Sequence, residues 1–276
     1  MEPEIFAPGI ISSKYWEHSP PVFSQDSKEV YWSVVFDDQN TGVIYYMKRQ
    51  NDQWTKPEVI SFSESKYRDI CPSLSSDGKT LYFTSSRPVE KNGKTGGHDM
   101  WFVKRKGNDW SEPQLLAPNI STGKDARSTF TRDEILYFGS WREGATGGSN
   151  LYRSKLVNGI YTKPENLDAI FSGANPMPSY VAPDESYMIF ESFRTGGFGG
   201  CDFWISLRQN DGSWEEPKNL GAKINSKGND WFGGFSPDMK YFFFVSDRGD
   251  NNDIYWVNAK IIDELRPKDL KETLIK

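Results

Sequence analysis

The sequence predicts an all-β protein: a five-bladed β-propeller of four-stranded antiparallel blades, with the ring closed by the N-terminal strand. One unit occurs five times, with an aspartate every 51 to 56 residues, and such a period is typical of solenoids and propellers. The aromatic content of 15% suits the pleated, half-buried surface of packed strands. The repeated aspartates are Asp26, Asp77, Asp133, Asp184 and Asp238.

Each repeat opens with a short strand that runs into a tight turn at this aspartate. Asp77-Gly78-Lys79 shows why a turn forms: Asp bonds its own backbone and Gly accepts a positive φ. A second strand follows, then a Gly-rich loop, a third strand, and a fourth that opens with Trp or Tyr and has Pro three residues later. Four antiparallel strands form one propeller blade, and Pro is tolerated on its outer edge. The second strands include 81–84, 136–139 and 241–244, the third 99–102, 150–153, 202–205 and 253–256, and the fourth begin at Trp54, Trp110, Tyr161 and Trp214.

The fifth repeat has no outer strand of its own after Trp256. The N-terminal Pro3-Glu4-Ile5-Phe6 matches Pro57-Glu58-Val59-Ile60 of the first repeat, so we expect it to pair with the last blade. Closing the ring removes an exposed sheet edge that would otherwise promote aggregation. We expect one domain over residues 1–276, with blades at about 20–60, 71–117, 127–168, 178–221 and 232–262 closed by 3–8, and a tail at 263–276 that is helical over 265–275 or frayed.

Charge and hydropathy argue against several classes of partner. The net charge of −5 comes from 33 basic and 38 acidic residues that are interspersed, so we expect no nucleic-acid partner. No apolar run approaches the length of a membrane span. Met1 is followed directly by Glu2-Pro3-Glu4, which is not a charged-then-apolar leader. Cys71 and Cys201 occupy different places in nonadjacent repeats and are interpreted as free thiols.

The repeat resembles the WD40-like, Pro-Asp repeat family of bacterial β-propellers, the type seen in TolB, over nearly the whole chain. The resemblance implies an exported, periplasmic or otherwise extracytoplasmic protein if a leader has been removed, and a cytoplasmic one if Met1 is the native start. It also implies a protein or carbohydrate partner; we expect a monomer. The first repeat departs from the pattern, with Val43 in place of Asp or Asn and Phe36 in place of Arg. The segments that carry the resemblance are 236–238, 182–184, 75–79, 96–99, 199–202 and the opening residues 6–12 and 17–19.

Two sets of polar residues recur at the top face, defined here as the face at which the innermost strands start. One set is acidic or polar, and the other is basic and follows each second strand. One interpretation is that arginine–carboxylate pairs join neighbouring blades, because such pairs favour bidentate geometry. The other is a polar ring that grips a ligand at the axis. The sets are Glu17, Asp69, Asp125, Asn175 and Asp230, and Arg87, Arg142, Arg194 and Arg248.

Residues that break the repeat are better candidates for ligand contact. Aromatic rings beside charges in a concave mouth offer a sugar or peptide a flat apolar face and hydrogen-bond partners. The competing interpretation is that these rings pack between blades. The additional candidates are Trp16, His18, Tyr67, Arg68, Arg127, Trp141, Trp231 and Phe232.

Glu191 stands where other repeats have Thr84, Gly139, Ser33 or Val245. A carboxylate there is a candidate acid or base, and pairing with an arginine is the alternative.

The sequence gives no sign of a bound cofactor or metal. The two histidines, His18 and His98, lie in different repeats and form no zinc set. Residues 247–253 are rich in oxygen ligands and are a candidate calcium site, but they lack the spacing of an EF-hand, so an ordinary loop is the preferred interpretation. No phosphate-binding loop, dinucleotide fingerprint or nucleophile elbow is present.

Two functional hypotheses remain open. The first is a non-catalytic binding propeller that recognises a protein or glycan through its top face. The second is a carbohydrate-active enzyme, which would need two carboxyl groups at a defined separation about the axis. Axial carboxylates saturated by arginine favour the first, whereas an exposed carboxylate with a raised pKa and no arginine partner favours the second.

Overall fold

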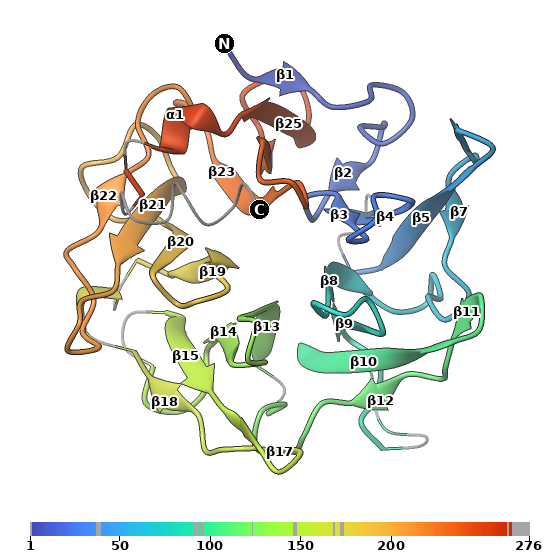
Figure 1. The fold of residues 1–276 in the computed structure, drawn as a ribbon, viewed down its shortest axis with the longest axis horizontal. Helices are drawn as coiled ribbons and strands as arrows, with labels where there is room; N and C mark the ends of the chain where they lie inside the picture. The colour runs from blue at the N-terminus through green and yellow to red at the C-terminus, as the bar shows by residue number, and fades with distance from the viewer. Residues whose placement is uncertain are drawn as a thin grey trace.

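The computed structural model describes residues 2–36, 40–90, 93, 97–122, 124–145, 148–167, 169–171, 174–263 and 265–266. Five antiparallel sheets surround a central axis, with the chain running from blade to blade in order (Figure 1). The predicted all-β, five-bladed propeller is therefore confirmed. The predicted tail beyond 266 and the Gly96 part of the family pattern lie outside the described residues.

The first two blades carry small additions to the four-strand plan. In blade 1 the inner strand is split in two, and in blades 1 and 2 the third strand also pairs with a two-residue strand that extends a hairpin. Blade 1 comprises β2 (Trp16–Glu17), β3 (Val22–Phe23), β4 (Glu29–Val35), β5 (Gly42–Gln50), β6 (Gln53–Trp54) and β7 (Glu58–Val59), and blade 2 comprises β8 (Ile70–Leu74), β9 (Thr80–Ser85), β10 (Asp99–Lys106), β11 (Asp109–Trp110) and β12 (Gln114–Leu115).

Blades 3 to 5 follow the four-strand plan more closely. A separate hairpin, β16 (Leu156–Val157) and β17 (Ile160–Tyr161), extends from blade 3, and a single 3-10 turn, η1 (Ala169–Phe171), leads to blade 4. Blade 3 comprises β13 (Asp125–Phe130), β14 (Leu136–Ser140), β15 (Asn150–Ser154) and β18 (Glu165–Asn166); blade 4 comprises β19 (Met177–Val181), β20 (Tyr187–Ser192), β21 (Asp202–Leu207) and β22 (Lys218–Asn219); blade 5 contains β23 (Asp230–Phe235), β24 (Tyr241–Ser246) and β25 (Asp253–Asn258), followed by α1 (Lys260–Asp263).

The N-terminal strand β1 (Glu4–Ile5) is the outer strand of blade 5, as predicted. Glu4 is opposite Trp256 and Ile5 is opposite Tyr255 in an antiparallel ladder. The Phe6 N–H adds a bond of 2.7 Å to the Ile254 carbonyl. The Phe6 ring also packs edge-on against Phe243, with centroids 4.9 Å apart. The N-terminal strand β1 and the last strand, β25, therefore lie side by side in one sheet (Figure 1).

The hydrophobic core is divided among the five interfaces between neighbouring blades. Successive residues of a strand point to opposite faces of its sheet, so each middle strand serves two interfaces. In β4, Tyr31 packs with Phe83 of blade 2, whereas Trp32 packs with Val245 of blade 5. Most of the largest fully buried side chains are aromatic, which helps a chain with 36% hydrophobic residues to build five interfaces.

The aspartate turns lie at the ends of the inner strands and define the bottom face. The Ser75 hydroxyl donates to Asp77 Oδ1 at 2.7 Å, and the Lys79 N–H donates to the same oxygen at 2.9 Å. The bond from the Lys79 N–H, and to a smaller extent the bond from the Ser75 hydroxyl, lower the pKa of Asp77. Gly78 has φ of +68°, as the turn requires.

Candidate functional site

The predicted arginine–carboxylate pairs form in blades 2, 3 and 5. Arg87 lies 2.8 Å from Asp69, Arg142 lies 2.7 Å from Asp125, and Arg248 lies 2.7 Å from Asp230. All three aspartates are fully buried. Each arginine Nε also bonds a serine at the end of the second strand, at 2.9 to 3.0 Å. These carboxylates are saturated, which favours a structural role for them.

The pairs form within one blade, which corrects the expectation that they join neighbours. The link to the preceding segment comes instead from an arginine N–H that bonds a backbone carbonyl: Arg142 bonds Ile120 at 2.8 Å, and Arg248 bonds Ile224. Each guanidinium also lies over two rings of its own blade, as Arg142 does over Phe138 and Tyr152. The network fixes the entry of each inner strand.

Blade 4 breaks this pattern because proline takes the place of aspartate. Met177 pairs with Glu191 as Ile70 pairs with Thr84, so Pro176 corresponds to Asp69. Asn175, which the sequence analysis aligned with the aspartates, lies one residue earlier and accepts the Ser149 N–H at 3.1 Å. Arg194 keeps its carbonyl bond, at 2.5 Å to Ile170, and the described residues offer it no carboxylate.

Blade 1 keeps the carboxylate but has Phe36 where the arginine would be. Glu17 is 1% exposed, and its Oε1 accepts the Ser13 N–H at 2.9 Å and the Ser13 hydroxyl at 2.8 Å. Its Oε2 is buried without a hydrogen-bond partner among the described residues. Burial raises the pKa of Glu17 from 4.5 to about 8, and the nearby Asp253 adds to the effect.

Glu191 sits near the axis and forms an ion pair with Arg127 of blade 3, one of the two alternatives considered for it. Its Oε2 accepts the Phe232 N–H of blade 5 at 2.6 Å and the Ser179 hydroxyl at 3.1 Å. The Arg127 guanidinium lies 3.9 Å from the centre of the Phe232 ring. Three blades therefore meet at one buried, fully bonded carboxylate.

Blades 1 and 2 contribute His18 and Arg68 to the same region. Arg68 Nη2 donates to His18 Nε2 at 2.9 Å, and the His18 ring meets Phe232 edge-on at 4.4 Å. Burial, followed by the charges of Arg68 and Arg127, holds the pKa of His18 well below its usual range. Burial also raises the pKa of the Cys71 thiol to about 11. We call His18, Arg68, Cys71, Arg127, Glu191 and Phe232 the axial cluster.

Bulges in the inner strands of blades 2, 3 and 5 link each of these blades to the preceding one. At Cys71, Arg127 and Phe232 the backbone takes a positive φ. Their N–H groups donate to Ser33, Thr84 and Glu191 of the preceding blade, at 3.1, 3.3 and 2.6 Å. In blade 4, where the preceding blade has Gly139 in place of the acceptor, the residue after Met177 is Pro178, which has no N–H. Donor and acceptor are thus both missing at this position.

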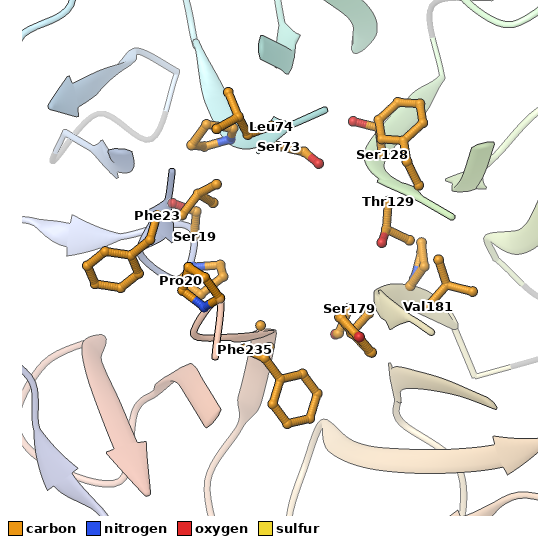
Figure 2. Close-up of a pocket in the computed structure, with 18 of the residues that line it drawn as sticks. Ser19, Pro20, Phe23, Ser73, Leu74, Ser128, Thr129, Ser179, Val181 and Phe235 are labelled. Carbon is orange, nitrogen blue, oxygen red and sulfur yellow. The ribbon is translucent and has the colours of Figure 1, made fainter. Parts of the chain in front are cut away.

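A cavity of about 630 Å³ lies on the axis between the axial cluster and the bottom face. Arg127, Cys71 and Phe232 stand at its inner end, and turn residues such as Gln25 and Ser76 stand at its mouth. Figure 2 shows its labelled lining residues arranged around the axis on inner strands of different blades. The remaining lining residues include hydroxyl groups and aromatic rings: Ser19, Ser73, Ser128, Thr129, Thr131, Ser179 and Ser236, and Phe23, Phe130, Tyr180 and Phe235.

The cavity and most of the predicted ligand residues lie on different parts of the molecule. All of those residues are described, and of them only Arg127 and Phe232 line the cavity. Trp16 and Trp141 are exposed, at 44% and 39%. Tyr67 lies under the Arg87 guanidinium, and Trp231 packs against the core at the blade 5–blade 1 interface. A top-face ligand site therefore stays a prediction.

Sequence reasoning identified the cavity-lining segments only as inner strands. The signal it missed is that residues such as Ser73, Thr129 and Ser179 carry small hydroxyl side chains where a packed interface would have larger apolar ones. Their side chains line the axis instead (Figure 2).

The structure also bears on metal binding and on membrane spans. Within the described ranges, no three His, Cys, Asp or Glu side chains gather closely enough to hold a metal ion. Asp247 uses both oxygens to accept bonds from Asn229, at 2.5 and 2.7 Å. Among the same residues, no helix has the length and apolar character needed to cross a membrane. Both cysteines are free and buried.

Comparisons with known proteins place the fold. No family model matches the chain, and no curated protein matches it. Solved structures do. A protein described as TolB from Agrobacterium tumefaciens has a TM-score of 0.57 and 18% identity, over 89% of this chain and 78% of that one. An α-L-arabinofuranosidase from Lactobacillus brevis has a TM-score of 0.55 and 14% identity, over 90% and 92%.

A gluconolactonase from Xanthomonas campestris matches with a TM-score of 0.50 and 11% identity, over 94% of both chains. What these proteins share with this chain is the propeller. Identities of 11 to 18% carry fold and not activity. The TolB-like architecture is therefore supported, and membership of the Pro-Asp repeat family remains an expectation.

Proposed function

We propose that the protein is a non-catalytic binding propeller that holds a protein segment or a glycan in its axial cavity. The observation that carries the proposal is the cavity itself, about 630 Å³ in volume and lined by all five blades. Ligand pockets fall in this size range and combine apolar walls with a few polar groups. Here aromatic rings and prolines provide the walls, and hydroxyl groups provide hydrogen-bond partners.

The state of the axial carboxylates supports binding over glycoside hydrolysis. Asp69, Asp125 and Asp230 are bonded by arginine, and Glu191 accepts bonds from three groups. Glu17 has a raised pKa, but it is 1% exposed and does not line the cavity. A hydrolase needs an acid and a second carboxylate on either side of an accessible bond.

A thermal-shift screen against calcium, oligosaccharides and short peptides tests the proposal. Ser73→Trp would fill the cavity from one wall, and Trp141→Ala would remove an exposed ring at the top face. We expect at least one sugar or peptide to raise the melting temperature of the wild type, and the rise to vanish in Ser73→Trp but persist in Trp141→Ala. Thr129→Trp serves as a second blocking variant if Ser73→Trp does not fold.

The opposite pattern, with the shift lost only in Trp141→Ala, would move the site to the top face. A shift that survives both blocking variants would reject the cavity as the site. An exported location is a separate proposal that rests on the family resemblance, and fractionation of the source cells tests it.

A further inference from the structure

The charged side chains that line the axial cavity have one sign. Among the described residues, two charged ones line it, and both are arginines: Arg127 at the inner end and Arg132 near the mouth. None of the described lining residues is Asp or Glu, although the chain as a whole carries a net charge of −5. A concave, low-dielectric site lined by one sign of charge favours a ligand of the opposite sign.

Arg127 is positioned by its surroundings. Its backbone N–H donates to the Thr84 hydroxyl, and its guanidinium carbon lies over the Phe232 ring, 3.9 Å from the centroid. Glu191 accepts from a single guanidinium nitrogen, Nη1, and is also bonded by the Phe232 N–H and the Ser179 hydroxyl. A guanidinium offers five N–H donors in a planar fork. Arg127 is therefore fixed in place with donor capacity beyond its bond to Glu191.

Ser128, at the inner end of the cavity beside Arg127, has a hydroxyl group without a hydrogen-bond partner among the described residues. It follows Arg127 in the chain, lines the cavity and is 9% exposed. A buried hydroxyl without a partner is costly, and a ligand oxygen beside it would remove that cost.

The rest of the wall is apolar. Phe130, Tyr180 and Phe235 line it together with Val181 and Leu74. A ligand that fits this surface presents an apolar body to the rings and a compact polar group to the inner end.

From these features, and resting on the proposed function, we infer that the axial cavity binds a ligand that carries a carboxylate on an apolar body, with the carboxylate bonded to Arg127 and Ser128. Carboxylate and guanidinium pair through parallel charge-assisted hydrogen bonds, so the acid should be preferred over its neutral amide. A free small acid and the C-terminus of a peptide share this chemistry.

Matched acid and amide probes test the inference by ligand-observed NMR titration. The first pair is 3-phenylpropionate and 3-phenylpropionamide, and the second is an N-acetylated tripeptide ending in phenylalanine, with a free or an amidated C-terminus. We expect each acid to bind about ten-fold more tightly than its amide, the effect of one charge-assisted hydrogen bond. The stronger of the two acids identifies the source as a small acid or a peptide terminus.

Variants of the inner end provide the control for charge. Arg127→Met alone would leave Glu191 buried without its partner, so we pair it with Glu191→Gln. In this double variant the acid-to-amide ratio should fall to about one. Ser128→Ala should reduce the ratio without abolishing binding. Arg49→Met, an exposed arginine paired with Asp52 away from the cavity, should leave it unchanged.

Three results would overturn the inference. Equal affinity for acid and amide, with binding still lost in Ser73→Trp, would reject the carboxylate and leave the proposed function standing. No saturable binding of either acid would also reject it, and the ligand screen described above would judge the proposed function separately. An acid preference that persists in the double variant would show that a group other than Arg127 recognises the carboxylate.

Discussion

Glu17 shows at the scale of one residue how a departure from the repeat changes chemistry. Its equivalents Asp69, Asp125 and Asp230 are buried beside arginines, whereas Phe36 stands in the arginine position of blade 1. Glu17 is left with one bonded oxygen and one buried oxygen without a partner among the described residues. A lone buried carboxylate prefers the protonated form, because burial disfavours charge.

The stability of the protein should therefore depend on the protonation of Glu17. Its pKa rises from 4.5 to about 8 on folding, so its contribution is fully present below pH 4.5 and is lost as the pH rises through about 8. Glu17→Gln removes this titration. The variant should gain stability relative to the wild type as the pH increases, by at most about 1.4 kcal/mol per pH unit. Urea unfolding at acidic, neutral and alkaline pH measures the difference.

Glu29 offers a matched control with the opposite sign. Burial alone would raise its pKa, but hydrogen bonds from Arg105 and Tyr31 outweigh burial and lower it. Glu29→Gln should therefore cost stability at neutral pH, and the cost should shrink in acid. If Glu17→Gln were less stable than the wild type at alkaline pH, the Glu17 carboxylate would have a charge partner and this account would fail.

The inner strand is the element in which sequence and structure diverge most. The aspartate turn and the strand order follow from local residues, and both are as predicted. The bulges at Cys71, Arg127 and Phe232 depend on an acceptor in the preceding blade, about 40 residues away, so no local pattern reveals them. The same bulges direct the following residues toward the axis and so shape the cavity.

Ser33 tests this link between blades. Its hydroxyl accepts the Cys71 N–H at 3.1 Å and donates to the His18 carbonyl at 3.1 Å, and the residue is fully buried. Ser33→Ala leaves both groups without this partner, which should cost about 1–3 kcal/mol in the free energy of unfolding. Ser33→Thr, which imitates Thr84 of blade 2, should retain most of that stability. A cost below about 0.5 kcal/mol for Ser33→Ala would mean that the bond contributes little.

At the scale of the whole molecule, the repeats make the fold predictable from the sequence but do not reveal the cavity. Five copies of one unit predict the number of blades and the closing strand, because the same strand pattern can be recognised in each copy by comparison with the others. The cavity arises where the copies face one another across the axis, and there Ser73, Thr129, Tyr180 and Gly234 differ from blade to blade. Residues of neighbouring blades that meet near the axis, such as Arg127 and Glu191, lie 64 positions apart and leave no spacing signal in the chain.

Ring closure by the N-terminal strand distinguishes a propeller from a row of blades, and a deletion tests it. Deleting residues 1–8 removes β1 from blade 5 and takes the Phe6 ring from Phe243 and Phe23. The lost ladder bonds and apolar contact should cost about 2–4 kcal/mol, or roughly 5–10 °C in melting temperature.

Deleting residues 1–3 alone, which spares β1, is the matched control and should change little. Because Ser12, which the deletion spares, still bonds Ile254 of the last blade, the shorter protein should unfold as one weakened unit, and calorimetry should show a single transition at lower temperature. An unchanged melting temperature would mean that blade 5 is stable with three strands and that the N-terminal strand contributes little to the stability of the ring.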